Sequence, residues 1–123
     1  MQIKKVLIDW GPVLAYAAII FYISSLPAAP AMSIGPPEFE IGSNIKHAAE
    51  YLMLSFLLLR ALANSGFRRP FLFAIIISIL YGASDELHQL FVTGRHGSVL
   101  DLIFDAIGSS LITVIKMIRY KRK

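Results

Sequence analysis

Most of the side chains able to do chemistry lie close together in the second half of a chain that is otherwise rich in apolar residues. Asp85, Glu86 and His88 end one apolar run, and Asp101 and Asp105 begin the next. Carboxylates and imidazoles can transfer protons, accept hydrogen bonds from hydroxyl or ammonium groups, or bind metal ions. We therefore expect the functional site to lie where these two runs meet.

Regular spacing predicts that the polar residues share helix faces. Residues three or four positions apart lie on one face of a helix. Glu86 lies about 100° around the helix from Asp85, so we expect it to serve a different edge of the cavity or a neighbouring helix. Three sets have the required spacing: His47, Glu50 and Tyr51; Tyr81, Asp85, His88 and Gln89; and Asp101, Asp105 and Gly108.

Composition favours an integral membrane protein. The chain has 123 residues, of which 56% are hydrophobic and 16% are charged, and its mean hydropathy is positive. A soluble domain of this size cannot bury so much apolar surface. The absence of cysteine excludes disulfides and thiolate metal sites. The formal charge of +4 comes from basic residues at the ends of apolar runs, so we expect no nucleic-acid partner.

Four apolar segments are long enough to cross a hydrocarbon layer of about 30 Å. We therefore predict one all-α domain over residues 1–123, a transmembrane bundle of four spans. A cleaved signal peptide is the alternative for the first segment, but that segment exceeds the ~7 to 15 apolar residues of a signal peptide. Residues 27–44 are predicted to form an irregular connection, and 65–70 and 93–98 short turns. The predicted spans are Val6–Leu26, Ile45–Asn64, Phe71–Val92 and Val99–Ile118.

Basic residues predict the orientation of this bundle. In a four-span arrangement every Lys and Arg except Lys46 and Arg95 falls on the same side as the two termini. The side richer in Lys and Arg faces the cytoplasm. We therefore predict a multi-pass protein of the cytoplasmic (inner) membrane, with both termini in the cytoplasm and most acidic residues in the outer half.

Spans two to four are too short unless they include their polar ends. Without those ends they cover only residues 51–63, 71–84 and 106–118, each about 20 Å long. Charged groups facing lipid would cost a few kcal/mol each, so we expect them to face one another around a wet cavity. The predicted outward-opening pocket consists of His47, Glu50, Tyr51, Tyr81, Asp85, Glu86, His88, Gln89, Arg95, Asp101 and Asp105.

These residues resemble the VanZ-like family of small membrane proteins. The resemblance implies a four-span bundle in the bacterial membrane and a role in the cell envelope, linked through the family's name to resistance to teicoplanin-type glycopeptides. It implies no defined biochemical activity. Asn44 and Ala48 depart from the lysine and the aromatic residue that family members often have at these positions. The resemblance rests on the residues from His47 to Tyr51, on the string from Tyr81 to Phe91, and on Arg95, Asp101, Asp105 and Gly108.

Recognition of a lipid is the first interpretation of the pocket. Arg95, His96 and Lys46 at its mouth would attract an anionic group, such as the phosphate of a lipid head group or of a lipid-linked wall precursor. Deeper in the pocket, Asp85, Glu86 and His88 would accept hydrogen bonds from hydroxyl or ammonium groups. The predicted partner is therefore a membrane lipid or a lipid-linked precursor.

Two other interpretations remain open. Ligands for zinc or manganese could come from a set in which we favour the first three: His47, Asp85, His88, Glu50 and Asp101. A water molecule on that metal could attack a phosphate ester or an amide. Asp85, Glu86 and His88 are then the candidate catalytic residues, although no complete metal motif such as H-E-x-x-H is present. Alternatively, the buried carboxylates and histidines only hold the helices together. A divalent metal is thus the one cofactor that we consider, and whether the protein is an enzyme stays open.

Overall fold

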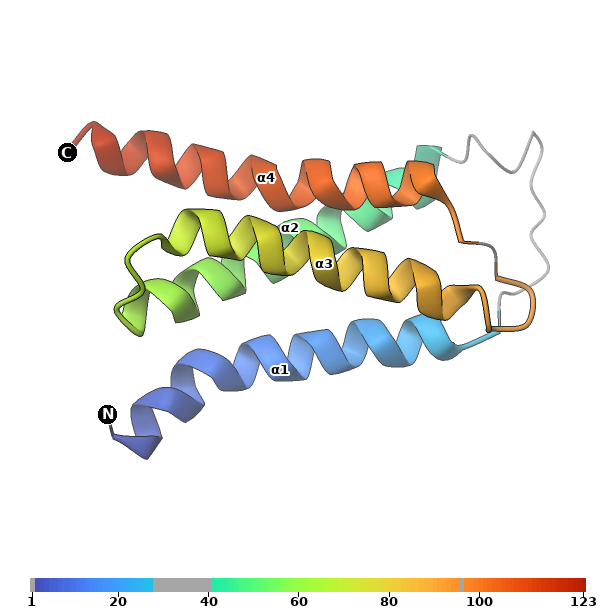
Figure 1. Ribbon diagram of the computed structural model, residues 1–123, viewed down its shortest axis with the longest axis horizontal. Helices are drawn as coiled ribbons and strands as arrows, with labels where there is room; N and C mark the ends of the chain where they lie inside the picture. The colour runs from blue at the N-terminus through green and yellow to red at the C-terminus, as the bar shows by residue number, and fades with distance from the viewer. Residues whose placement is uncertain (1, 28–40, 96) are drawn as a thin grey trace.

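Four helices form the described part of the chain, which comprises residues 2–27, 41–95 and 97–123 and contains no strand. A computed structural model arranges them along one long axis (Figure 1). The beginning of α1, the α2–α3 turn and the end of α4 lie at one end of the bundle, and the α3–α4 connection lies at the other. The helices are α1 (Ile3–Ser25), α2 (Ile41–Asn64), α3 (Pro70–Gln89) and α4 (Val99–Lys121).

Each helix has one boundary that differs from the predicted one by three or four residues: α1 begins at Ile3 rather than Val6, and α4 ends at Lys121 rather than Ile118. Helix α2 begins at Ile41, before the predicted start, while residues 28–40 of the predicted connection lie outside the described residues. Helix α3 ends at Gln89 rather than Val92 because the chain turns there. The amide of Val92 donates to the carbonyl of Gln89, and Gly94 takes a positive φ of 76° that favours glycine.

Much of the exposed surface is apolar, and much of the interior is polar. Large apolar side chains such as Leu14, Leu80 and Leu111 are more than half exposed, whereas Ser78 and Ser109 are completely buried. Helices α1 and α3 are long and apolar enough to cross a membrane. The described part of the chain is all-helical and has two candidate membrane-spanning helices, and the crossing of the membrane by α2 and α4 stays a prediction.

Helices α2 and α4 make the most extensive contact in the bundle. Their backbones approach closely at Gly108, where a Cβ atom would overlap the carbonyl group of Ala48. Only a glycine can stand there without displacing α2. This approach brings the residues that precede Ala48 next to the first turns of α4.

Buried hydroxyl groups tie three helices together. The Ser55 hydroxyl of α2 donates to the carbonyl of Ser109 in α4 (2.7 Å) and lies 2.9 Å from the hydroxyl of Thr113. The Ser78 hydroxyl of α3 lies 2.6 Å from that of Ser109, which donates to the carbonyl of Asp105 (2.7 Å). These bonds satisfy buried polar groups and fix the register of α4 just below Asp105.

Helix α1 covers α2 and α3 through polar contacts at several heights. The indole of Trp10 donates to the Ser65 hydroxyl (3.0 Å), and the amide of Asn64 donates to Asp9 (2.7 Å). Near the middle of the helix, the Tyr81 hydroxyl donates to the carbonyl of Ala17. One face of α3 is therefore directed at α1, away from α2 and α4.

Candidate functional site

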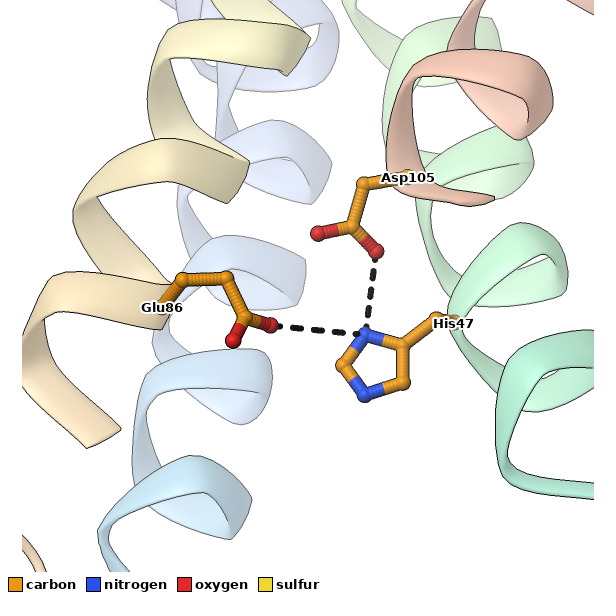
Figure 2. A group of neighbouring side chains, drawn as sticks. All are labelled: His47, Glu86 and Asp105. Atoms are coloured by element: carbon orange, nitrogen blue, oxygen red, sulfur yellow. Dashed lines mark hydrogen bonds and ion pairs between the residues drawn. The ribbon is translucent and has the colours of Figure 1, made fainter. Parts of the chain in front are cut away.

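One imidazole and three carboxylates meet at the end of the bundle that holds the α3–α4 connection. The Nδ1 atom of His47 lies 3.0 Å from Oδ1 of Asp105 and 3.9 Å from Oε1 of Glu86. Its Nε2 atom lies 3.8 Å from Oδ2 of Asp101. Figure 2 shows Glu86 and Asp105 pointing at the same nitrogen from different helices. We call His47, Glu86, Asp101 and Asp105 the acid–imidazole cluster.

Local structure fixes the positions of these side chains. Ser98 is the N-cap of α4, and its hydroxyl accepts a hydrogen bond from the amide of Asp101 (3.3 Å). The backbone amide of Ser98 donates to Oε2 of Glu86 (3.0 Å), which leaves Oε1 directed at His47. His47 directly precedes Ala48 at the close approach of α2 and α4. The cluster is therefore built where three helices are held in fixed register.

The cluster is deeply buried and leaves polar atoms without partners. The exposed fraction of the side chain is 0% for Asp105, 9% for Glu86 and 12% for His47. Oε1 of Glu86 and Oδ2 of Asp105 have no hydrogen-bond partner among the described residues. Even a protonated imidazole would balance only one of three ionised carboxylates, and unbalanced charge in a buried site is costly. The geometry therefore favours a cation, or a group that donates protons, bound at this point.

A second group of unpartnered oxygens lies beside the cluster. Tyr51 is completely buried, and neither its hydroxyl nor Oδ1 of Asp85 has a hydrogen-bond partner within the described ranges. Gly82 separates the groups: a Cβ atom there would lie 3.0 Å from Oδ2 of Asp105 and 3.2 Å from the Tyr51 ring. Gln89 donates to the other Asp85 oxygen (3.4 Å). The absence of a side chain at Gly82 thus lets Asp105 and Tyr51 both pack closely against this point of α3.

Two of the predicted pocket residues face α1 instead. Nε2 of His88 lies 2.9 Å from the Ser25 hydroxyl, and its ring stacks on Phe21 with ring centroids 4.6 Å apart. The Tyr81 hydroxyl donates to Ala17 of the same helix. The structure therefore brings His47 together with Glu86 and Asp105, and not with His88.

Two of the three cations predicted at the pocket mouth, Arg95 and Lys46, contact other parts of the protein. The guanidinium of Arg95 donates to the carbonyls of Leu26 (3.1 Å) and Ile23 (3.2 Å), so it satisfies the free carbonyl end of α1. Lys46 pairs with Glu50 at 3.7 Å on the surface of α2. His96 lies outside the described residues. Neither Arg95 nor Lys46 is directed at the acid–imidazole cluster by these contacts.

The cluster also has the composition of a metal site. One ligand atom from each of His47, Glu86 and Asp105 lies within 4.8 Å of the other two. Ligand atoms around a tetrahedral zinc ion lie about 3.3 Å apart, so only small side-chain movements would be needed. Asp101, on the opposite nitrogen of the imidazole, is placed as an outer partner that would orient the ring. These ligands differ from the predicted set of His47, Asp85 and His88.

Sequence reasoning missed the roles of Ser98 and of the Gly108–Ala48 contact. Ser98 begins a Ser-x-x-Asp pattern before an apolar run, which is a usual signal for a helix start and would have identified the cap. The pairing of two small residues across α2 and α4 has a weaker signal, because small residues are common in membrane helices. Neither signal would have shown that Ser98 also holds Glu86.

Comparison with known families gives one match. The model of the family described as VanZ/LLP1 matches residues 13–120, which include all four residues of the acid–imidazole cluster. This match confirms the resemblance inferred from the polar motifs. Comparison with the curated proteins and with the solved structures gives no match.

Proposed function

Since this chain belongs to the VanZ/LLP1 family, we propose that it is an envelope membrane protein that binds a polar lipid head group or a lipid-linked wall intermediate. The proposed topology has four spans in the cytoplasmic membrane, with cytoplasmic termini and the acid–imidazole cluster in the outer half. The observation that carries the proposal is the set of buried, unpartnered oxygens that three helices direct toward one another. An effect on susceptibility to teicoplanin-type antibiotics would follow from binding a wall intermediate.

Hydroxyl and ammonium groups fit this site best. The unpartnered atoms are carboxylate and phenol oxygens, which accept hydrogen bonds from such groups. Charged acceptors form the stronger hydrogen bonds, and they do so most effectively where water is excluded. The anionic part of the same ligand would have to compete with the α1 carbonyls for Arg95. We therefore assign most of the specificity to the carboxylates rather than to the basic residues at the rim.

Glu86→Gln is expected to weaken binding of the polar lipid about ten- to a hundredfold, because a lost hydrogen bond to a charged group costs about 1.5–3 kcal/mol. The change keeps the shape of the side chain and an oxygen for the Ser98 amide. Native mass spectrometry of the purified protein with a bacterial membrane lipid extract would identify the retained lipid and compare its occupancy in the two proteins.

Asp9→Asn is the matched control, because it makes the same carboxylate-to-amide change at the opposite end of the bundle. It should leave lipid occupancy unchanged. Equal lipid occupancy in wild type and folded Glu86→Gln protein would contradict the proposal.

A divalent metal ion is the second candidate ligand, favoured by the mutual approach of His47, Glu86 and Asp105 within 4.8 Å. A bound zinc or manganese ion would supply an activated water, as in a hydrolase or transferase that acts on a lipid head group. Elemental analysis of protein purified without chelator should then give about one metal ion per chain. His47→Gln should abolish this content, whereas His88→Gln should retain it because His88 contacts α1. Metal-free wild-type protein would remove this candidate and leave the lipid proposal standing.

A further inference from the structure

A groove opens at the end of the bundle opposite to the acid–imidazole cluster. It has a volume of about 970 Å³ and lies between the end of α2, the beginning of α3 and the end of α4. Its floor is apolar, with Phe56 and Leu59 from α2, Leu72 from α3 and Met117 from α4. The rings of Phe71 and Tyr120, 6.2 Å apart, connect α3 to α4 beside it.

Basic side chains from separate elements surround this floor. Arg68 and Arg69 from the α2–α3 turn, and Lys116 and Lys121 from α4, line the groove, and no acidic residue does so in the described part of the chain. Arg60 of α2 lines it too, but its guanidinium donates to the carbonyl of Ile8. The side chains of Arg68, Arg69 and Lys121 are exposed and take no part in the hydrogen bonds and ion pairs between described residues. The ammonium of Lys116 lies 5.1 Å from the centre of the Phe56 ring, at the boundary between rim and floor.

We propose that this groove binds an anionic phospholipid, with the phosphate between Arg68, Arg69 and Lys121 and an acyl chain along the floor. The combination of an apolar floor and a cationic rim matches such a lipid, whereas a soluble anion would leave the floor in contact with water. Guanidinium groups are suited to phosphate because they donate hydrogen bonds in pairs. In the proposed topology this end faces the cytoplasmic leaflet, where anionic lipids produce a negative surface potential.

Orientation of the protein in the membrane does not by itself account for the groove. The positive-inside rule requires only that basic residues lie on one side of the membrane. Here cations from the turn and from α4 converge on one hollow, although Lys4 and Lys5 at the beginning of α1 would serve orientation equally well without lining it. The proposal is independent of the acid–imidazole cluster, so either binding site can fail its test without the other.

Lipid titration of the full-length protein in detergent, followed by native mass spectrometry, tests the proposal. We expect phosphatidylglycerol to be retained at least about tenfold more strongly than phosphatidylcholine. The double variant Arg68→Gln/Arg69→Gln should weaken retention of phosphatidylglycerol about thirtyfold. Each basic residue near an anionic lipid surface strengthens binding about fivefold, and the variant removes two. Lys4→Gln/Lys5→Gln removes the same charge at the same end and should leave retention unchanged.

A third variant tests the floor without changing charge. Ala63 is exposed and lines the groove, so Ala63→Trp should fill it and reduce retention of phosphatidylglycerol while circular dichroism shows an unchanged helix content. Equal retention of the two lipids by the wild type would overturn the proposal. So would an equal loss in the Lys4/Lys5 variant, or full retention in folded Ala63→Trp protein.

Discussion

Gly108→Ala is expected to destabilise the bundle by about 3 kcal/mol or more, at the upper end of what overpacking costs. The added methyl group would overlap the backbone carbonyl of Ala48, and a backbone atom cannot rotate away as the end of a side chain can. Helices α2 and α4 would have to separate. Because His47 adjoins Ala48 and Asp105 lies one turn before Gly108, the separation would also break the hydrogen bond between His47 and Asp105. Unfolding in detergent, followed by far-ultraviolet circular dichroism, measures the loss.

Two other glycines provide matched controls for this substitution. Gly11 has no atom within 4 Å of the added Cβ position, so Gly11→Ala should be neutral or slightly stabilising through helix propensity. Gly82→Ala should have an intermediate effect, because its nearest contact is a carboxylate oxygen of Asp105 at 3.0 Å, and that side chain can move. If Gly108→Ala and Gly11→Ala have the same free energy of unfolding, the close approach of α2 and α4 at Gly108 is contradicted.

Helices and family could be predicted from the sequence because both depend on local patterns. Apolar runs interrupted by Pro70 and by the turn around Gly94 define the helices to within a few residues. The spacing of Asp101 and Asp105 predicts that their carboxylates share a helix face whatever that face packs against. In the structure both carboxylates lie beside the imidazole of His47.

The partner of each face could not be predicted in the same way. Tyr81, Asp85 and His88 share one spacing, yet Tyr81 and His88 contact α1, while Asp85 is buried and its neighbour Glu86 reaches His47. Which side of α3 faces α1 depends on the packing of all four helices. The spacing of residues within one helix does not determine that packing. Arg95 shows the same limit, because its contacts with the end of α1 depend on where the α3–α4 turn leads.

His47→Ala is expected to be the most damaging change within the acid–imidazole cluster, with a loss of about 3–5 kcal/mol in the free energy of unfolding. The variant would leave the buried carboxylates of Glu86 and Asp105 facing each other without the imidazole between them. His88→Ala is the control, because it removes an imidazole that stacks on Phe21 of α1 and lies outside the acid–imidazole cluster. The loss in the free energy of unfolding of His88→Ala should stay at about 1 kcal/mol, which is the contribution of one hydrogen bond.

The double variant His47→Leu/Asp105→Leu separates a structural role of the cluster from a binding role. Replacing both members of a buried ion pair by apolar residues is often neutral or stabilising, so the double variant should be more stable than His47→Ala. If the cluster only holds the helices together, lipid occupancy in this folded variant will equal that of the wild type, and glycopeptide susceptibility will be unchanged. We expect instead that it folds, loses the lipid proposed to bind at the cluster and changes the glycopeptide susceptibility of cells that carry it, because the unpartnered oxygen of Asp105 is then gone from the site.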